Sequence, residues 1–239
     1  MKGFDLTQAI SMVLPFAEAV LALIALTLLV KQRALGQYKS LAAILIFLFS
    51  MSVAGLLTTH LHPANRHLLY EIYFYFFWSS WFVEAILMPI FCYGILTRLF
   101  SYFPGMRLMS TRVFGWIVFL WCAASASLFF TPHVNGLHLM TAEVTQLKLL
   151  EGGISLLTAA LVLICTRPLG LQLRSPLPAF SVGLIFSAMG VFSSYLFRAI
   201  TPQQYQWVVI VGSVAVCAQL LSWVAAIGWS ERTRRIVSV

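Results

Sequence analysis

Charged residues are scarce in this sequence. Only 9% of its 239 residues are Asp, Glu, Lys or Arg, whereas 61% are hydrophobic. Soluble domains carry about 25% charged residues, so this composition excludes an ordinary soluble protein. Apolar runs long enough to cross a hydrocarbon core of about 30 Å recur along the chain. We therefore predict one all-α integral membrane domain over residues 1–239, with no space for a separate soluble domain.

Motifs that would indicate an enzyme are also missing. The sequence has no Walker A motif, nucleophile elbow or zinc-protease signature, so nothing in it argues for catalysis. All lysines are predicted at or beyond the ends of apolar runs, which excludes a retinal Schiff base. The four cysteines lie inside apolar runs and form no disulfide framework. The net charge of +8 is spread over the ends of these runs, so we expect no nucleic-acid partner.

Long apolar windows bounded by charged residues predict seven membrane-spanning helices. Short connections with Pro, Gly or Asn separate several of the windows, which is typical of helical hairpins. A transmembrane barrel is excluded because the runs are continuous rather than alternating. The predicted spans cover about 6–30, 41–60, 68–100, 113–130, 145–165, 179–197 and 207–229.

The distribution of Lys and Arg predicts the orientation of the bundle. With seven spans, eleven of the 15 basic residues fall on one side and four on the other. Basic residues near helix ends are retained in the cytoplasm. We therefore predict that the N-terminus lies outside, the C-terminus lies in the cytoplasm, and the lipid bilayer surrounds the chain.

Four polar side chains are predicted deep inside the spans. Glu84 lies near the predicted midplane, Glu18 and Glu151 lie in the outer half, and Gln219 lies near the middle of the last span. Ionisable groups are costly inside a bilayer, so each is a candidate site residue. Either they hydrogen-bond neighbouring helices, or they line a polar cavity that opens outward. Lys148 lies one turn from Glu151 and could pair with it, whereas Glu84 has no cation at its predicted depth and is our first candidate.

The histidines all fall on the predicted outer side, at or near the second and fourth loops. Imidazoles gathered on one face could bind zinc or copper, or respond to pH. The alternative is that they lie at the interface without a ligand. We predict no other cofactor. The candidate metal ligands are His60, His62, His67, His133 and His138.

Aromatic residues are dense near the start of the third predicted span, over residues 70–78 and at Trp81 and Phe82. They fit an aromatic belt at the interface, or a ring-lined pocket for a hydrophobic ligand. In the sixth span, small residues recur at helical spacing and predict a face for close helix contact. These residues are Gly183, Ser187, Gly190 and Ser194.

Two segments carry a resemblance to a known family. Tyr73-Phe-Tyr-Phe-Phe-Trp78 and Phe100-Ser-Tyr-Phe-Pro-Gly-Met-Arg107 resemble the aromatic segment and the following turn of a family of small, uncharacterised bacterial seven-helix membrane proteins. Phe77 departs from the tyrosine of that pattern, and no acidic residue precedes Arg98. The resemblance implies the architecture only. We separately predict a multi-pass location in the bacterial inner membrane. The layout is also similar to the seven-helix sensor regions of histidine kinases.

Three functions are consistent with these observations. The first is a sensory or accessory membrane subunit without its own catalytic domain, which would work with a signalling or membrane-complex partner. The second is a transporter or proton-coupled carrier that uses Glu18, Glu84 and Gln219. The third is a membrane redox or metal-binding subunit that uses the histidines.

The predicted topology can be tested with introduced cysteines and a membrane-impermeant thiol reagent in intact cells. Cysteines at Asn135 and Gln204 should be labelled, because these positions are predicted outside. Cysteines at Ser110, Ser175 and Ser238 should react only after the cells are opened. Labelling of the Ser238 position in intact cells would refute the orientation.

Overall fold

All regular structure that the computed structural model describes is helical. It describes residues 6–36, 38–60, 66–101, 136–166, 176–200 and 205–237, and single residues or short stretches between 105 and 123. A further helical segment between α3 and α5 includes residues 114–119. The predicted all-α class is confirmed. The long helices are α1 (Leu6–Lys31), α2 (Lys39–His60), α3 (Arg66–Leu99), α5 (Gly136–Thr166), α6 (Leu177–Ile200) and α7 (Tyr205–Val237).

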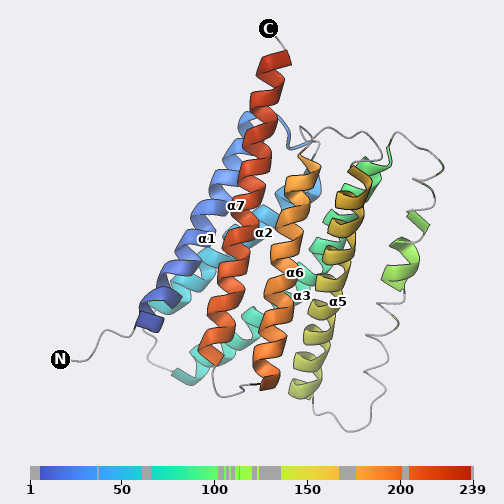
Figure 1. The fold of residues 1–239 in the computed structure, drawn as a ribbon. Helices are drawn as coiled ribbons and strands as arrows, with labels where there is room; N and C mark the ends of the chain where they lie inside the picture. Colours follow the sequence, from blue (N-terminus) through green and yellow to red (C-terminus); the bar gives the residue numbers. More distant parts are fainter. Residues whose placement is uncertain are drawn as a thin grey trace.

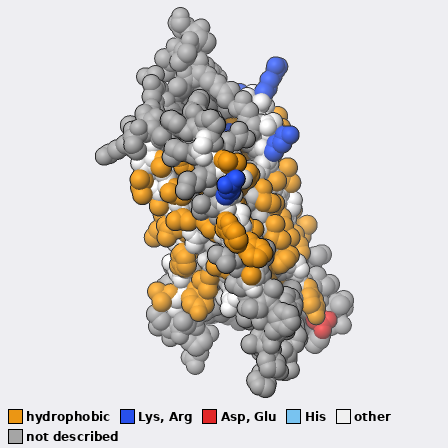
Figure 2. All heavy atoms as spheres, turned by 90° about the vertical axis from the view of Figure 1, so that its right-hand side faces the viewer, with side chains coloured by type: hydrophobic (Ala, Val, Ile, Leu, Met, Phe, Trp, Pro, Cys, Tyr) orange, Lys and Arg blue, Asp and Glu red, His pale blue; other side chains and the backbone are white. Residues whose placement is uncertain are grey.

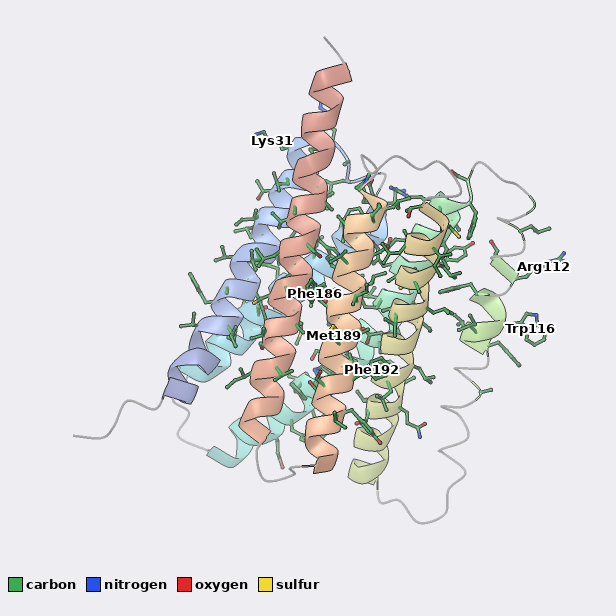
Figure 3. All side chains as sticks on the ribbon, viewed as in Figure 1. Lys31, Arg112, Trp116, Phe186, Met189 and Phe192 are labelled. Atoms are coloured by element: carbon green, nitrogen blue, oxygen red, sulfur yellow. The ribbon has the colours of Figure 1, made fainter. Side chains whose placement is uncertain are left out.

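These six helices are long and apolar enough to cross a membrane. Many large apolar side chains also point outward, such as Ile46, Met189 and Leu221. Figure 2 shows hydrophobic side chains over the middle of one face, with Lys and Arg in its upper half. Figure 3 shows Phe186, Met189 and Phe192 along α6, and each is exposed. An apolar exterior of this kind suits a hydrocarbon environment rather than water. Contact of apolar side chains with lipid tails has no free-energy cost, whereas their exposure to water does.

The six helices close into a ring. Along the ring, α1 packs on α2, α2 on α3, α3 on α5, α5 on α6, α6 on α7, and α7 returns to α1. The segment with residues 114–119 lies outside this ring, beside α3 and α5 in Figure 1. Its Phe114 ring is 5.4 Å from the Tyr93 ring of α3. The six long helices therefore enclose the interior of the ring by themselves, and this segment does not form part of the ring.

Helices α3 and α5 are neighbours that run in the same direction. Glu84 of α3 contacts Lys148 of α5, and further along both helices Cys92 lies 3.9 Å from Ser155 between Sγ and Oγ. α3 thus ends at one end of the bundle, and α5 begins at the other (Figure 1). The connection over 100–135 joins opposite ends of the ring.

Close contact between α6 and α7 depends on small residues. A Cβ at Gly190 would lie 2.5 Å from the Cβ of Ala215, and a Cβ at Gly183 would overlap the Trp223 side chain. The Trp223 indole donates a hydrogen bond from Nε1 to the Phe180 carbonyl over 3.3 Å. The predicted small-residue face on the sixth span is confirmed, because only residues without bulky side chains let the two backbones approach.

The apolar core fills one half of the ring. It occupies the half where α1 and α3 end, with Trp223, Phe180, Leu41 and Leu99 almost fully buried. The Phe91 ring lies 5.2 Å from Trp223 and 6.1 Å from Phe180 between ring centroids, in T-shaped contacts. Aromatic packing of this kind holds α3, α6 and α7 together. The other half of the ring contains the polar side chains.

We expect Gly190→Ala to lower stability by about 1–3 kcal/mol, because the added methyl group overpacks the contact with α7. Thermal unfolding in detergent measures this as a lower Tm. Gly153→Ala is the matched control, since a Cβ there meets nothing within 4 Å. Adding Ala215→Gly to Gly190→Ala should restore the Tm, and failure of this rescue would contradict the proposed contact.

Candidate functional site

A polar cavity occupies the half of the ring opposite the apolar core. Its volume is about 300 Å³, and residues from all six helices of the ring line it. The lining residues lie toward the ends where α1, α3, α5 and α7 begin and where α2 and α6 end. The polar residues of its wall are Glu18, Ser52, Ser80, Glu84, Thr145, Lys148, Ser187, Ser194 and Ser213.

A buried ammonium group lies between two carboxylates at the wall of this cavity. Lys148 Nζ is 2.5 Å from Glu84 Oε2 and 2.9 Å from Glu151 Oε2. Lys148 is 6% exposed and Glu151 only 1%. Glu151 and Lys148 lie one turn apart on α5, and the parallel packing of α3 brings Glu84 to the same ammonium. The structure contains the pair between Lys148 and Glu151 that the spacing predicted.

The expectation that Glu84 has no cation at its depth was wrong. α5 begins at Gly136, well before the predicted start of the fifth span at residue 145. Lys148 therefore lies inside the helix, and its side chain is buried within the ring and does not extend toward the interface. The absence of a buried lysine was thus no valid ground for excluding a retinal protein. In the structure, this ammonium is held by two carboxylates.

Glu18 of α1 lines the same cavity with different partners. Ser52 of α2 donates to Glu18 Oε2 over 3.4 Å, and Ser213 of α7 also hydrogen-bonds this carboxyl group. Glu18 is close enough to Glu84 for the two carboxyl groups to repel each other when both are charged. Among the described residues, no Lys or Arg pairs with Glu18.

The charges around the cavity do not balance. Glu84 and Glu151 contact the Lys148 ammonium, and Glu18 adds a third carboxyl group near Glu84 without a described cation of its own. Unbalanced charge is expensive in a low-dielectric interior. The site therefore favours at least one additional positive charge, either a proton on a carboxyl group or a cation in the cavity.

Aromatic rings form a further part of the wall. Phe77 and Trp81 of α3 both line the cavity, with ring centroids 4.7 Å apart. Lys148 Nζ lies 5.9 Å from the Trp81 ring, within reach of a cation–π interaction. Tyr75 and Phe82 of the same aromatic segment are about half exposed on the outside. One face of the segment thus lines the cavity, and the other faces outward.

Two of the predicted polar residues do not line the cavity. Glu151 lies behind Lys148, and its Oε1 has no hydrogen-bond partner among the described residues. Gln219 of α7 is buried next to the core residue Leu220, and neither amide atom finds a partner within the described part of the chain. We expected one cavity lined by all four polar groups. The structure has a cavity lined by only two of them, Glu18 and Glu84, without Glu151 and Gln219.

Sequence reasoning missed Lys148 as a site residue and read the serines of α6 as packing only. The helical spacing of Lys148 and Glu151 was the available signal for the first. For Ser187 and Ser194, the same face that packs on α7 also lines the cavity. No local pattern distinguishes the two roles.

The predicted metal ligands fall outside what the structure describes. His62 and His133 lie outside the described residues, and the side chains of His60, His67 and His138 are likewise not described. Within the described part of the chain, no group of three or more His, Cys, Asp or Glu side chains could hold a metal ion. A zinc or copper site at these histidines stays a prediction.

Comparison of the chain with protein-family models, with curated proteins and with solved structures found no match.

We expect Lys148→Met to destabilise the protein by about 3–5 kcal/mol, because it leaves two buried carboxylates without their cation. Thermal unfolding in detergent measures the change, and Lys31→Met, at an exposed lysine, serves as control. Adding Glu84→Gln and Glu151→Gln to Lys148→Met should recover much of the loss, because the variant then buries no charge at this place. An unchanged Tm for Lys148→Met would show that the ion pairs do not form.

Proposed function

We propose that this protein is a seven-helix membrane sensory or accessory subunit that binds a small organic cation in the polar cavity. One observation carries the proposal: a cavity inside the helix ring that is lined by two carboxylates, an ammonium and aromatic rings. Its volume of about 300 Å³ is at the lower end of the range for small-molecule sites. A ligand of a few carbon atoms with one ammonium group fits this volume.

The direction of the helices in the ring supports an odd number of spans. Because α3 and α5 run in the same direction, the connection over 100–135 has to return along the bundle. If that connection also crosses the membrane, the chain has seven spans and its two ends lie on opposite sides. The excess of Lys and Arg on one side then supports a cytoplasmic C-terminus. In this orientation, the cavity lies in the outer half of the bilayer.

The charge imbalance supports a cation as the ligand. Lys148 is shared between two carboxylates, and Glu18 has only hydroxyl partners among the described residues. An ammonium group between Glu18 and Glu84 would relieve their repulsion, and Phe77 and Trp81 would contact its apolar part. An anionic ligand would meet an excess of negative charge.

A bound cation would also change contacts between helices. Lys148 connects α5 to α3 through Glu84. A ligand ammonium that attracts Glu84 competes for this contact, so Lys148 would pair more strongly with Glu151 on its own helix. Binding of the cation in the cavity would thus change the packing of α3 on α5. This change in packing is the signal that a partner protein would detect.

A proton-coupled carrier is the second candidate, and Glu18 favours it. A half-buried carboxyl group in the membrane, without a cationic partner among the described residues, is a natural proton acceptor. A carrier, however, must also open the half of the ring that Trp223, Phe180 and Leu99 now fill. A sensor needs only the open half, so the packed core favours the sensory function.

The ligand class can be tested with benzylammonium, phenethylammonium and tetramethylammonium as probes. At saturating concentration, at least one should raise the Tm of the purified protein, because a ligand that binds only the folded state stabilises it. Benzyl alcohol and phenethyl alcohol, which lack the charge, should not. Glu18→Gln should remove the effect, whereas Glu71→Gln, at an exposed carboxylate outside the cavity, should keep it.

Equal stabilisation by an ammonium compound and its alcohol would refute the cation site, as would no response to any probe. Uptake of a bound probe into proteoliposomes under a proton gradient would instead identify a carrier. Binding without uptake supports the sensory function.

A further inference from the structure

A second cavity lies at the other end of the bundle. It has a volume of about 510 Å³ and lies where α2 and α6 begin and where α3 ends. The apolar core separates it from the polar cavity. Its polar wall consists of Tyr38, Lys39, Ser40, Thr97 and Arg98.

The charge at this cavity is positive and unopposed. Lys39 and Arg98 both line it, and neither pairs with a carboxylate in the described part of the chain. The acidic residues whose side chains the structure describes, Glu18, Glu71, Glu84 and Glu151, all lie in the other half of the bundle. The two cations are therefore available to an external anion.

Arg98 is held in place by aromatic contacts. Its guanidinium carbon lies 3.9 Å from the centre of the Tyr38 ring, and the Tyr38 ring packs 5.5 Å from Phe180. A stacked guanidinium keeps its N–H donors directed outward in its plane. Such a group binds a phosphate with little further loss of side-chain freedom.

The ends of two helices add to the positive potential. Both α2, which begins at Lys39, and α6, which begins at Leu177, direct their N-termini to this cavity. The N-terminus of a helix carries a partial positive charge that favours anions. α3 ends at the same cavity with the partial negative charge of its C-terminus, so the two cationic side chains are the main source of the positive potential.

Below the cations the wall is apolar and open to the outside. Ile90 is 50% exposed and Tyr93 36% exposed, and both line the cavity, about two turns and about one and a half turns of α3 before Arg98. They belong to the part of α3 that is apolar enough to lie in the membrane. A ligand in this cavity would therefore meet charge at one end and hydrocarbon-facing surface at the other.

We propose that this cavity binds an anionic phospholipid, with its phosphate at Lys39 and Arg98 and an acyl chain along Ile90 and Tyr93. Basic pockets between membrane helices bind lipid phosphates in this manner. The continuity from cations to exposed apolar surface favours a lipid over a free phosphate ion, which would use only the polar end. The proposal is independent of the cation site in the other half of the ring.

Native mass spectrometry of the detergent-solubilised protein tests this inference. Added phosphatidylglycerol should bind at least about tenfold more tightly than phosphatidylcholine, because each basic residue contributes to binding of an anionic headgroup. Arg98→Gln combined with Lys39→Gln should reduce the preference to near unity. Lys31→Gln removes the same charge at the same end of the bundle (Figure 3) and should keep it.

Arg98→Lys provides a second measurement if the double variant does not fold. It retains the charge but loses the stacked planar group, so we expect an intermediate affinity for phosphatidylglycerol. Equal binding of the two lipids by the unaltered protein would overturn the proposal. So would equal loss in Lys31→Gln and the double variant, or displacement of the lipid by millimolar inorganic phosphate, which would identify a site for the free ion.

Discussion

The contact of Lys148 with Glu84 and Glu151 is the interaction on which the polar half of this protein depends. An ammonium buried in a helix ring is stable only when carboxylates surround it, and these come from two neighbouring parallel helices. The contact therefore fixes how far α3 and α5 are shifted along each other, because it holds Glu84 level with Lys148. It also places Glu84 on the cavity wall, near Glu18 of α1.

The ring divides its interior into two parts with different physical properties. In one half, Phe91, Phe180 and Trp223 fill the space, and glycines on α6 let α7 approach closely. In the other half, serines and charged side chains lie among apolar residues such as Phe47 and Met51 around a cavity. A packed half stabilises the ring, so the polar half can retain open volume and uncompensated charge.

The two ends of the bundle also differ in charge. The acidic side chains that the structure describes lie in the half with the polar cavity, while Lys39 and Arg98 lie at the opposite end. The proposed cation site and the proposed anionic-lipid site, at opposite ends of the bundle, both rest on this one asymmetry. Because the apolar core lies between them, each site can be altered by mutation without touching the residues of the other.

The sequence by itself determined the features that depend on local composition and spacing. Apolar runs predicted membrane-spanning helices, since the transfer of a run into hydrocarbon depends on the residues within it. Helical periodicity similarly predicted the glycine face of α6 and the pairing of Lys148 with Glu151. Only the tertiary structure decided which helices are neighbours. The contact of Glu84 with Lys148, the serines around Glu18 and the stacking of Arg98 on Tyr38 all join different helices. Such contacts depend on the order and direction of helices in the ring, and no residue spacing within one helix carries that information.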